Sequence, residues 1–156
     1  MLQKLRTRTE GEAGFTLVEL LVVMLILGLL AAIAIPSFFN QRDKAKDADA
    51  KESVRTAQTA IETYATDNDG SYAAASANAL RGIEATLNDA PGTLTVTPNA
   101  AGDGYTVSVQ QADTLNTFNI RRYGSSDATA SQAAGTVTYT CSTAGDAGCP
   151  SSGNWG

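Results

Sequence analysis

Glu19 is the single charged residue in an apolar run of 21 residues, from Phe15 to Ile35. As a helix, this run would be about 31 Å long, close to the thickness of the hydrocarbon core of a bilayer. A carboxylate inside such a span costs on the order of a few kcal/mol unless it lies near the interface or has a partner. Two interpretations follow from the residues alone: an acid at the level of the headgroups with no further role, or an acid that waits for a positive partner in an assembly.

The apolar run is expected to stay in the mature protein as a membrane anchor. It is too long for the apolar core of an ordinary secretory signal, and the sequence Ala34-Ile35-Pro36-Ser37 is a poor match to a signal cleavage site. Basic residues flank the run equally on both sides, so the count of positive charges does not set its orientation. The polar domain and the cysteine pair that follow favour a single-pass protein with its N-terminus inside the cell.

Two cysteines, Cys141 and Cys149, lie close together near the C-terminus. In a small polar domain, this spacing predicts a disulfide in an oxidising compartment. Two unrelated free thiols are the alternative.

The remaining composition argues against catalysis. The chain has no histidine, no Gly-x-Ser-x-Gly motif, no phosphate-binding loop and no cluster of metal ligands. The run Asp67-Asn68-Asp69-Gly70 does not have the spacing of a calcium-binding helix–loop–helix site. The formal charge is −5, which does not suit binding to nucleic acid phosphates. We therefore expect no enzyme activity, no cofactor, no metal site and no nucleic acid partner.

The sequence Gly14-Phe15-Thr16-Leu17-Val18-Glu19, followed directly by the apolar run, resembles the prepilin cleavage and methylation motif. This motif belongs to type IV pilins and type II secretion pseudopilins, and the resemblance covers about residues 8–65. A short basic leader precedes the motif in that family, as Lys4, Arg6 and Arg8 do here. The acidic Glu10 and Glu12 depart mildly from the family pattern, but the cleavage site itself is intact.

The resemblance implies a maturation and assembly pathway. A prepilin peptidase would cut between Gly14 and Phe15 and methylate the new amine of Phe15. An assembly platform in the inner membrane, driven by an ATPase, would then move the subunit from membrane lipid into a helical homopolymer. The residues implied in assembly are Phe15, Thr16 and Glu19, with Glu19 paired to the Phe15 amine of a neighbouring subunit.

Gly28 and Pro36 are unusual inside a helix, since glycine weakens a helix interior and proline removes an amide donor. A gentle kink in a membrane helix is one interpretation. The resemblance implies another, in which residues 28–36 lose helical structure in the filament.

The rest of the chain predicts an α+β fold. An apolar stripe continues the helix to about Asp67, on positions Ala50, Val54, Ala57, Ile61 and Tyr64. The charges between 42 and 55, including the helix-spaced pairs Asp47–Lys51 and Glu52–Arg55, predict a solvated helix face or a contact with neighbouring subunits. A short helix is expected over 76–89. Four antiparallel strands are expected at 93–97, 104–110, 115–121 and 136–141, with their apolar face on the helix stripe.

These patterns divide the chain into four parts. Residues 1–14 form a leader that is removed, residues 15–36 a transmembrane or filament-core helix, residues 37–70 the amphipathic half of the same helix, and residues 71–156 a globular head with a C-terminal disulfide loop. The predicted function is that of a pilin, first in the cytoplasmic membrane and then in an extracellular type IV pilus. A pseudopilin of a type II secretion system is the alternative within the family, and a membrane-tethered binding domain is the alternative from another class.

Overall fold

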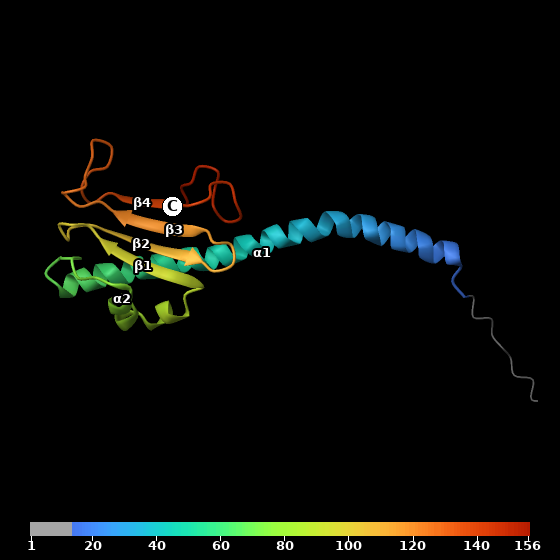
Figure 1. Cartoon of the computed structure of the whole chain (residues 1–156), viewed down its shortest axis with the longest axis horizontal. Helices are drawn as coiled ribbons and strands as arrows, with labels where there is room; N and C mark the ends of the chain where they lie inside the picture. The colour runs from blue at the N-terminus through green and yellow to red at the C-terminus, as the bar shows by residue number, and fades with distance from the viewer. Residues whose placement is uncertain (1–13) are drawn as a thin grey trace, which may run out of the picture. The chain divides into compact units, whose positions relative to one another are not determined.

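The computed structural model of the chain describes residues 14–156, so the leader predicted at residues 1–14 lies outside the described residues except for Gly14. The chain divides into two compact units, Met1–Phe38 and Phe39–Gly156. In Figure 1 the second unit holds all the strands. Each unit is described by itself below.

Helix α1 (Leu17–Asp67) contains 51 residues and includes Pro36. Its bounds agree with the predicted helix over 15–67. The end of α1 is closed by Gly70, which has a φ of 81° and donates its amide to the carbonyl of Ala65 at 2.8 Å. A left-handed glycine just past a helix commonly satisfies the last carbonyls in this way.

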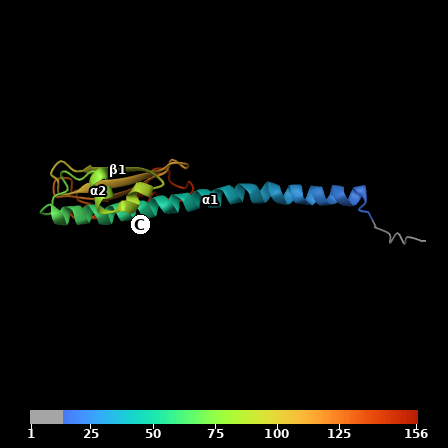
Figure 2. The ribbon, with the colours of Figure 1, turned by 90° about the horizontal axis from the view of Figure 1, so that it is seen from below.

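The sheet has four antiparallel strands in the order β1 (Gly92–Pro98), β2 (Tyr105–Gln111), β3 (Thr117–Arg122) and β4 (Val137–Cys141). Each strand therefore pairs with its neighbour in sequence, as expected for strands with short connections. Helix α2 (Ala77–Ile83) and the 3-10 helix η1 (Ala85–Asp89) precede the sheet. Figure 2 shows the sheet lying over the part of α1 that belongs to the second unit. The predicted α+β class and the four-stranded antiparallel sheet are confirmed.

Most predicted elements end within one or two residues of their observed bounds, and two differ for a reason that the backbone explains. The helix expected over 76–89 is divided at Glu84, whose φ of −128° and ψ of 100° are those of an extended residue. The strand expected from Leu115 begins only at Thr117. Leu115 instead lies in the connection from β2, with a φ of 60°. A residue in the left-handed region cannot continue the pleat of a strand, which is why this prediction was wrong by two residues.

The core lies between α1 and one face of the sheet. Four residues of the predicted stripe, Ala50, Val54, Ala57 and Ile61, are fully buried, whereas the fifth, Tyr64, is only partly buried. Asp47, Ala60 and Ala65 are buried as well. The facing strands contribute alternate residues, as the period of two of a half-buried strand requires. These are Leu94, Val107, Val109, Phe118 and Ile120.

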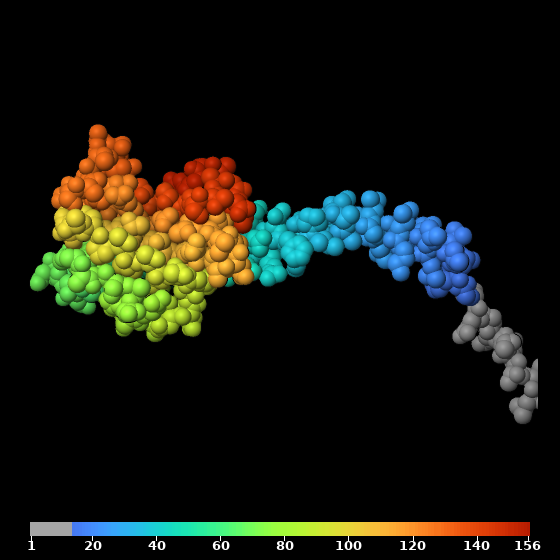
Figure 3. All heavy atoms as spheres, viewed as in Figure 1, coloured from blue at the N-terminus to red at the C-terminus, as the bar shows by residue number. Residues whose placement is uncertain are grey.

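The C-terminal segment closes the outer edge of β4. The amide of Cys141 donates to the carbonyl of Gly153 at 2.9 Å, and the indole of Trp155 donates to the carbonyl of Thr140 at 2.8 Å. Figure 3 shows these last residues, in red, gathered beside the sheet. An edge strand with unpaired backbone groups would otherwise be a template for pairing with another chain. Trp155 is only 9% exposed, so its side chain packs on the domain.

Candidate functional site

The start of α1 is fixed by Thr16. Its Oγ1 accepts a hydrogen bond from the amide of Glu19 at 3.1 Å, and its carbonyl accepts from the amide of Leu20 at 3.2 Å. This is the geometry of a helix N-cap, and Thr16-x-x-Glu19 has the spacing of a capping box. This capping pattern is present in the sequence, whereas the resemblance implied only a role in assembly for Thr16. The cap starts the helix two residues after the Gly14–Phe15 bond.

The apolar side chains of the first half of α1 are exposed in the chain taken by itself. An 18-residue window of this helix has a mean hydropathy of 2.9 and no buried residue, so by length and composition the helix is able to cross a membrane. Glu19 is exposed within this apolar surface, and no residue of the described range 14–156 forms an ion pair with it. The large exposed side chains are Phe15, Leu17, Val18, Leu20, Leu21, Val22, Val23, Met24, Leu25, Ile26, Leu27, Leu29, Leu30, Ile33 and Ile35.

Gly28 and Pro36 both lie within continuous helix. A Cβ built on Gly28 meets no atom within 4 Å, so no close contact within the chain requires glycine there. The loss of helix between these two residues in a filament stays a prediction.

Asp47 does not lie on a solvated helix face, contrary to the prediction for this charged region. Its side chain is fully buried. The carboxylate accepts hydrogen bonds from Thr114 Oγ1 at 2.5 Å, from Asn116 Nδ2 at 2.9 Å and from the amide of Gly148 at 2.9 Å. A buried carboxylate is very unfavourable without such donors. Asp47 therefore joins α1 to the β2–β3 loop and to the C-terminal loop, both of which are distant in sequence.

Lys51 binds the carbonyl of Gly148, the residue whose amide binds Asp47. Its Nζ donates to the carbonyl of Gly148 at 2.6 Å and lies 5.2 Å from the centre of the Phe118 ring. Burial lowers the pKa of Lys51, while the charge of Asp47 opposes that shift. The expected direct Asp47–Lys51 pair is thus replaced by a shared partner, since both side chains bind the backbone of Gly148. A Cβ at Gly148 would lie 2.5 Å from the Cβ of Asp47, so the contact requires glycine.

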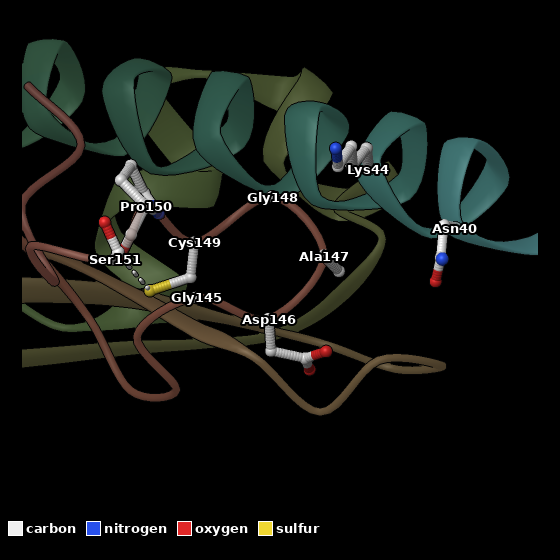
Figure 4. A pocket seen from close by; sticks show the side chains of 9 residues that line it. All are labelled: Asn40, Lys44, Gly145, Asp146, Ala147, Gly148, Cys149, Pro150 and Ser151. Carbon is white, nitrogen blue, oxygen red and sulfur yellow. Dashed lines mark hydrogen bonds between the residues drawn. The ribbon is translucent and has the colours of Figure 1, made fainter. Parts of the chain in front are cut away.

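The C-terminal loop is closed by a disulfide between Cys141 and Cys149, as predicted. Figure 4 shows the hollow between this loop and α1, with Gly148 near the helix and Asp146 and Lys44 at its sides. The cavity has a volume of about 480 Å³ and is lined by Asn40, Lys44 and residues 145–151.

A second carboxylate, Glu62, receives two tyrosine hydroxyls. Tyr72 and Tyr105 each donate to it at 2.8 Å, and Arg122 lies 3.5 Å away. Burial, followed by the contact with Glu62, raises the pKa of Tyr72 to about 12 and raises that of Tyr105 as well. Both hydroxyls therefore stay protonated and serve as donors to a carboxylate on the helix. This arrangement fixes the far end of α1 to the sheet.

A third polar cluster joins the turn after β1 to the loop after β3. Asp103 accepts from the amide and the hydroxyl of Ser125, and also from Asn99 Nδ2 at 2.7 Å. Hydrogen bonds from Ser125 and then from Asn99 lower the pKa of Asp103 to about 2. Within the described range 14–156, no group of three or more acidic, cysteine or histidine side chains is placed to hold a metal ion. The cluster ties two loops together.

Two features stand out among the described residues: a head with a buried core, and one long helix whose apolar first half is exposed. Residues 11–35 match the family model of the prokaryotic N-terminal methylation motif. In this N-terminal segment the chain carries the methylation motif that type IV pilins and pseudopilins share.

The relatives carry three different functional names. The chain is 40% identical over 57 residues to the type II secretion system core protein G of Pseudomonas aeruginosa, which is 36% of this chain and 40% of that protein. It is 41% identical over 56 residues to the type IV major pilin protein PilA of Myxococcus xanthus, which is 36% of this chain and 26% of that protein. It is also 36% identical over 58 residues to the competence protein ComGC of Halalkalibacterium halodurans, covering 37% of this chain and 57% of that protein.

The chain therefore matches less than two thirds of the length of each of these relatives. No solved structure matches the chain. Each of these three matches covers little more than a third of this chain. The matched relatives are named as a pilin, a secretion-system core protein and a competence protein, in agreement with the prediction that the chain is not an enzyme.

Proposed function

We propose that this protein is a structural subunit of an extracellular type IV pilus. A prepilin peptidase removes residues 1–14, and the subunit polymerises through the first half of α1 into a helical homopolymer. Residues 15–36 anchor the subunit in the cytoplasmic membrane before assembly, with the N-terminus inside. An inner-membrane assembly platform and its ATPase supply the work of extraction.

The observation that carries this proposal is the exposed apolar half of α1, which lies within residues 11–35 that match the methylation motif. A soluble monomer rarely leaves an apolar surface of this extent uncovered. Lipid covers such a surface before assembly, and the same segment of other copies covers it in a filament. Glu19 gives that packing a register, because a subunit in the wrong position leaves a carboxylate unpaired among apolar side chains.

A pseudopilin of a type II secretion system is the second candidate, because several relatives are named as core protein G of such systems. The C-terminal loop closed by Cys141 and Cys149 favours the pilus, because pilins often carry such a loop. A membrane-tethered binding domain is the candidate from another class, and it would keep residues 1–14.

Intact mass spectrometry tests all three candidates. The material sheared from the cell surface is compared with the membrane fraction of the same cells. The pilus predicts a sheared species that begins at methylated Phe15 and is two hydrogens lighter because of its disulfide. A processed species found only in the envelope would support the pseudopilin. A chain that keeps residues 1–14 in both fractions would contradict a filament subunit of either kind.

A further inference from the structure

Leu115 is an exposed apolar residue in an unfavourable backbone conformation. It is 64% exposed, and its φ is 60°. Glycine, asparagine and aspartate adopt this left-handed region readily, whereas a larger side chain makes it strained. A leucine here is therefore unfavourable in two independent ways for the isolated subunit. Such local exceptions, once observed, point to a role outside the fold itself.

The loop around Leu115 is held in place by its own hydrogen bonds. The amide of Leu115 donates to the carbonyl of Gln111 at 3.0 Å, and the amide of Gln111 donates to the carbonyl of Asn116 at 2.9 Å. The side-chain Oε1 of Gln111, which is buried, accepts from the amides of Asp113 and Thr114. The conformation of Leu115 is thus determined by the loop that surrounds it.

The same loop is fixed to α1 at two places. Thr114 donates to the buried carboxylate of Asp47 at 2.5 Å, and Asp113 forms an ion pair with Lys46 at 2.7 Å. The contact with Lys46 also lowers the pKa of Asp113, which keeps the ion pair charged. The head therefore presents the Leu115 side chain from a fixed position, without a loss of conformational freedom when a partner binds.

We propose that Leu115 packs against the exposed apolar segment 17–35 of α1 in a second copy of this chain. This inference rests on the proposed function as a filament subunit. Among the large apolar side chains of the described range 14–156, those that are exposed lie between Phe15 and Phe39, with only Ile83 and Leu115 elsewhere. A second copy thus offers Leu115 one extensive apolar surface, and that surface itself needs cover outside the membrane.

The symmetry of such a contact suits a filament. Leu115 and segment 17–35 are different surfaces of the same chain, so each copy offers its loop to one neighbour and its helix to another. A contact of this heterologous kind does not close on itself as a two-fold dimer does, and it continues into an open helical array. Leu115 would add a contact between head and helix to the packing of helix on helix.

Site-specific photo-crosslinking in filament-forming cells tests the contact. Leu115 is replaced by p-benzoylphenylalanine, sheared filaments are irradiated, and the products are digested and identified by mass spectrometry. We expect a species of twice the chain mass in which position 115 is joined to a peptide from residues 15–35. The same replacement at Ile83, which is 40% exposed, is the matched control and is expected to give no such product. A cross-link within one chain, an adduct with lipid, or a product no more abundant than at Ile83 would overturn the inference.

The variant Leu115→Asn separates assembly from folding, because asparagine tolerates a positive φ. We expect its head to be at least as stable as the wild type, measured by the fluorescence of Trp155, and its yield of sheared filaments to be severalfold lower. An unchanged yield would overturn the role of Leu115 while leaving the proposed function intact. A wild-type strain that sheds no filaments would instead contradict the proposed function, and this inference with it.

Discussion

Residues 17–35 and residues 47–65 belong to the same helix, but they bury their apolar side chains in different ways. In the second segment, Val54, Ala57 and Ile61 lie on one stripe and are fully buried against the sheet. In the first segment, large apolar side chains point in all directions and are exposed. A helix that is apolar on every side is typical of a membrane span or of a core in which it is surrounded.

The two segments also treat their carboxylates differently. Asp47 is buried and accepts hydrogen bonds from three donors of the same chain. Glu19 is exposed and has no ion-pair partner among residues 14–156. The comparison shows that the second segment completes its interactions within one chain. The first segment exposes both its apolar surface and its charge.

The substitution Glu19→Ala should have the largest effect. It removes a charged group from every contact between subunits of the proposed filament, whereas the other substitutions change the stability of one head. We expect filaments to disappear from the sheared fraction, while the envelope still contains a chain cut before a methylated Phe15. Intact mass spectrometry of both fractions measures this. Glu52→Ala, on an exposed residue in the second half of α1, is the control and should leave filaments unchanged. Normal filaments from Glu19→Ala would contradict the view that Glu19, unlike Asp47, has its partner in another subunit.

The substitution Asp47→Ala should destabilise the head by about 3 kcal/mol, because it leaves three donors from two loops, one of them the buried amide of Asn116, without their acceptor. Urea unfolding of the full chain in detergent, followed by the fluorescence of Trp155, measures the change. Asp49→Ala is the matched control two residues along the helix, where the side chain is exposed and a change within about 0.5 kcal/mol is expected. Equal effects at the two positions would mean that Asp47 does not organise the loops.

Removal of the disulfide with the double substitution Cys141→Ser and Cys149→Ser should cost about 2–3 kcal/mol. The bond closes a short loop, with a sequence separation of 8, so it restricts the unfolded chain only modestly. It also keeps Gly148 in position to bind Asp47 and Lys51. The same urea titration measures the effect, with Ser151→Ala as the control in the same loop. A free energy of unfolding equal to that of the wild type would show that the loop docks without its covalent bond.

Acid should weaken the head by a smaller amount and leave the first half of α1 unchanged. The pKa of Asp103 falls from 3.8 to about 2 because of donors that favour its charged form in the fold. A carboxyl with a lowered pKa in the folded state stabilises the protein above its ordinary pKa, and this stability is lost as the pH falls from about 4 to about 2. The exposure of the group keeps the effect small.

The acid effect is measured as the shift of the urea midpoint between pH 4 and pH 2.5. Asp103→Asn should reduce that shift, since it removes the titrating group while retaining one acceptor oxygen. The helical signal of the detergent-embedded segment should stay constant over the same range. An identical shift in wild type and variant would assign the acid sensitivity to other carboxyls. Asp113 and Asp127 are the candidates, because contacts with Lys46 and Arg121 lower their pKa values.

Much of the architecture could be predicted from the sequence because it depends on local periodicity. The stripe of α1, the alternation in β2 and the glycine after the helix each specify an element from neighbouring residues. The errors fell where local pattern and backbone geometry diverge. Leu115 continues an apolar pattern, but the tight connection from β2 requires a left-handed residue at that position. Glu84 interrupts a plausible helix with an extended conformation.

The sequence by itself determined the apolar segment 15–35, the position of the methylation motif, the α+β class and the disulfide between its two cysteines. Only the tertiary structure decided that Asp47 is buried, that Gly148 admits no side chain and that Leu115 is presented from a fixed loop. The physical reason is distance along the chain. Asp47 meets Thr114 and Gly148 across 67 and 101 positions, and whether a charged helix residue faces water or such partners is set by how the sheet and the C-terminal loop fold onto it.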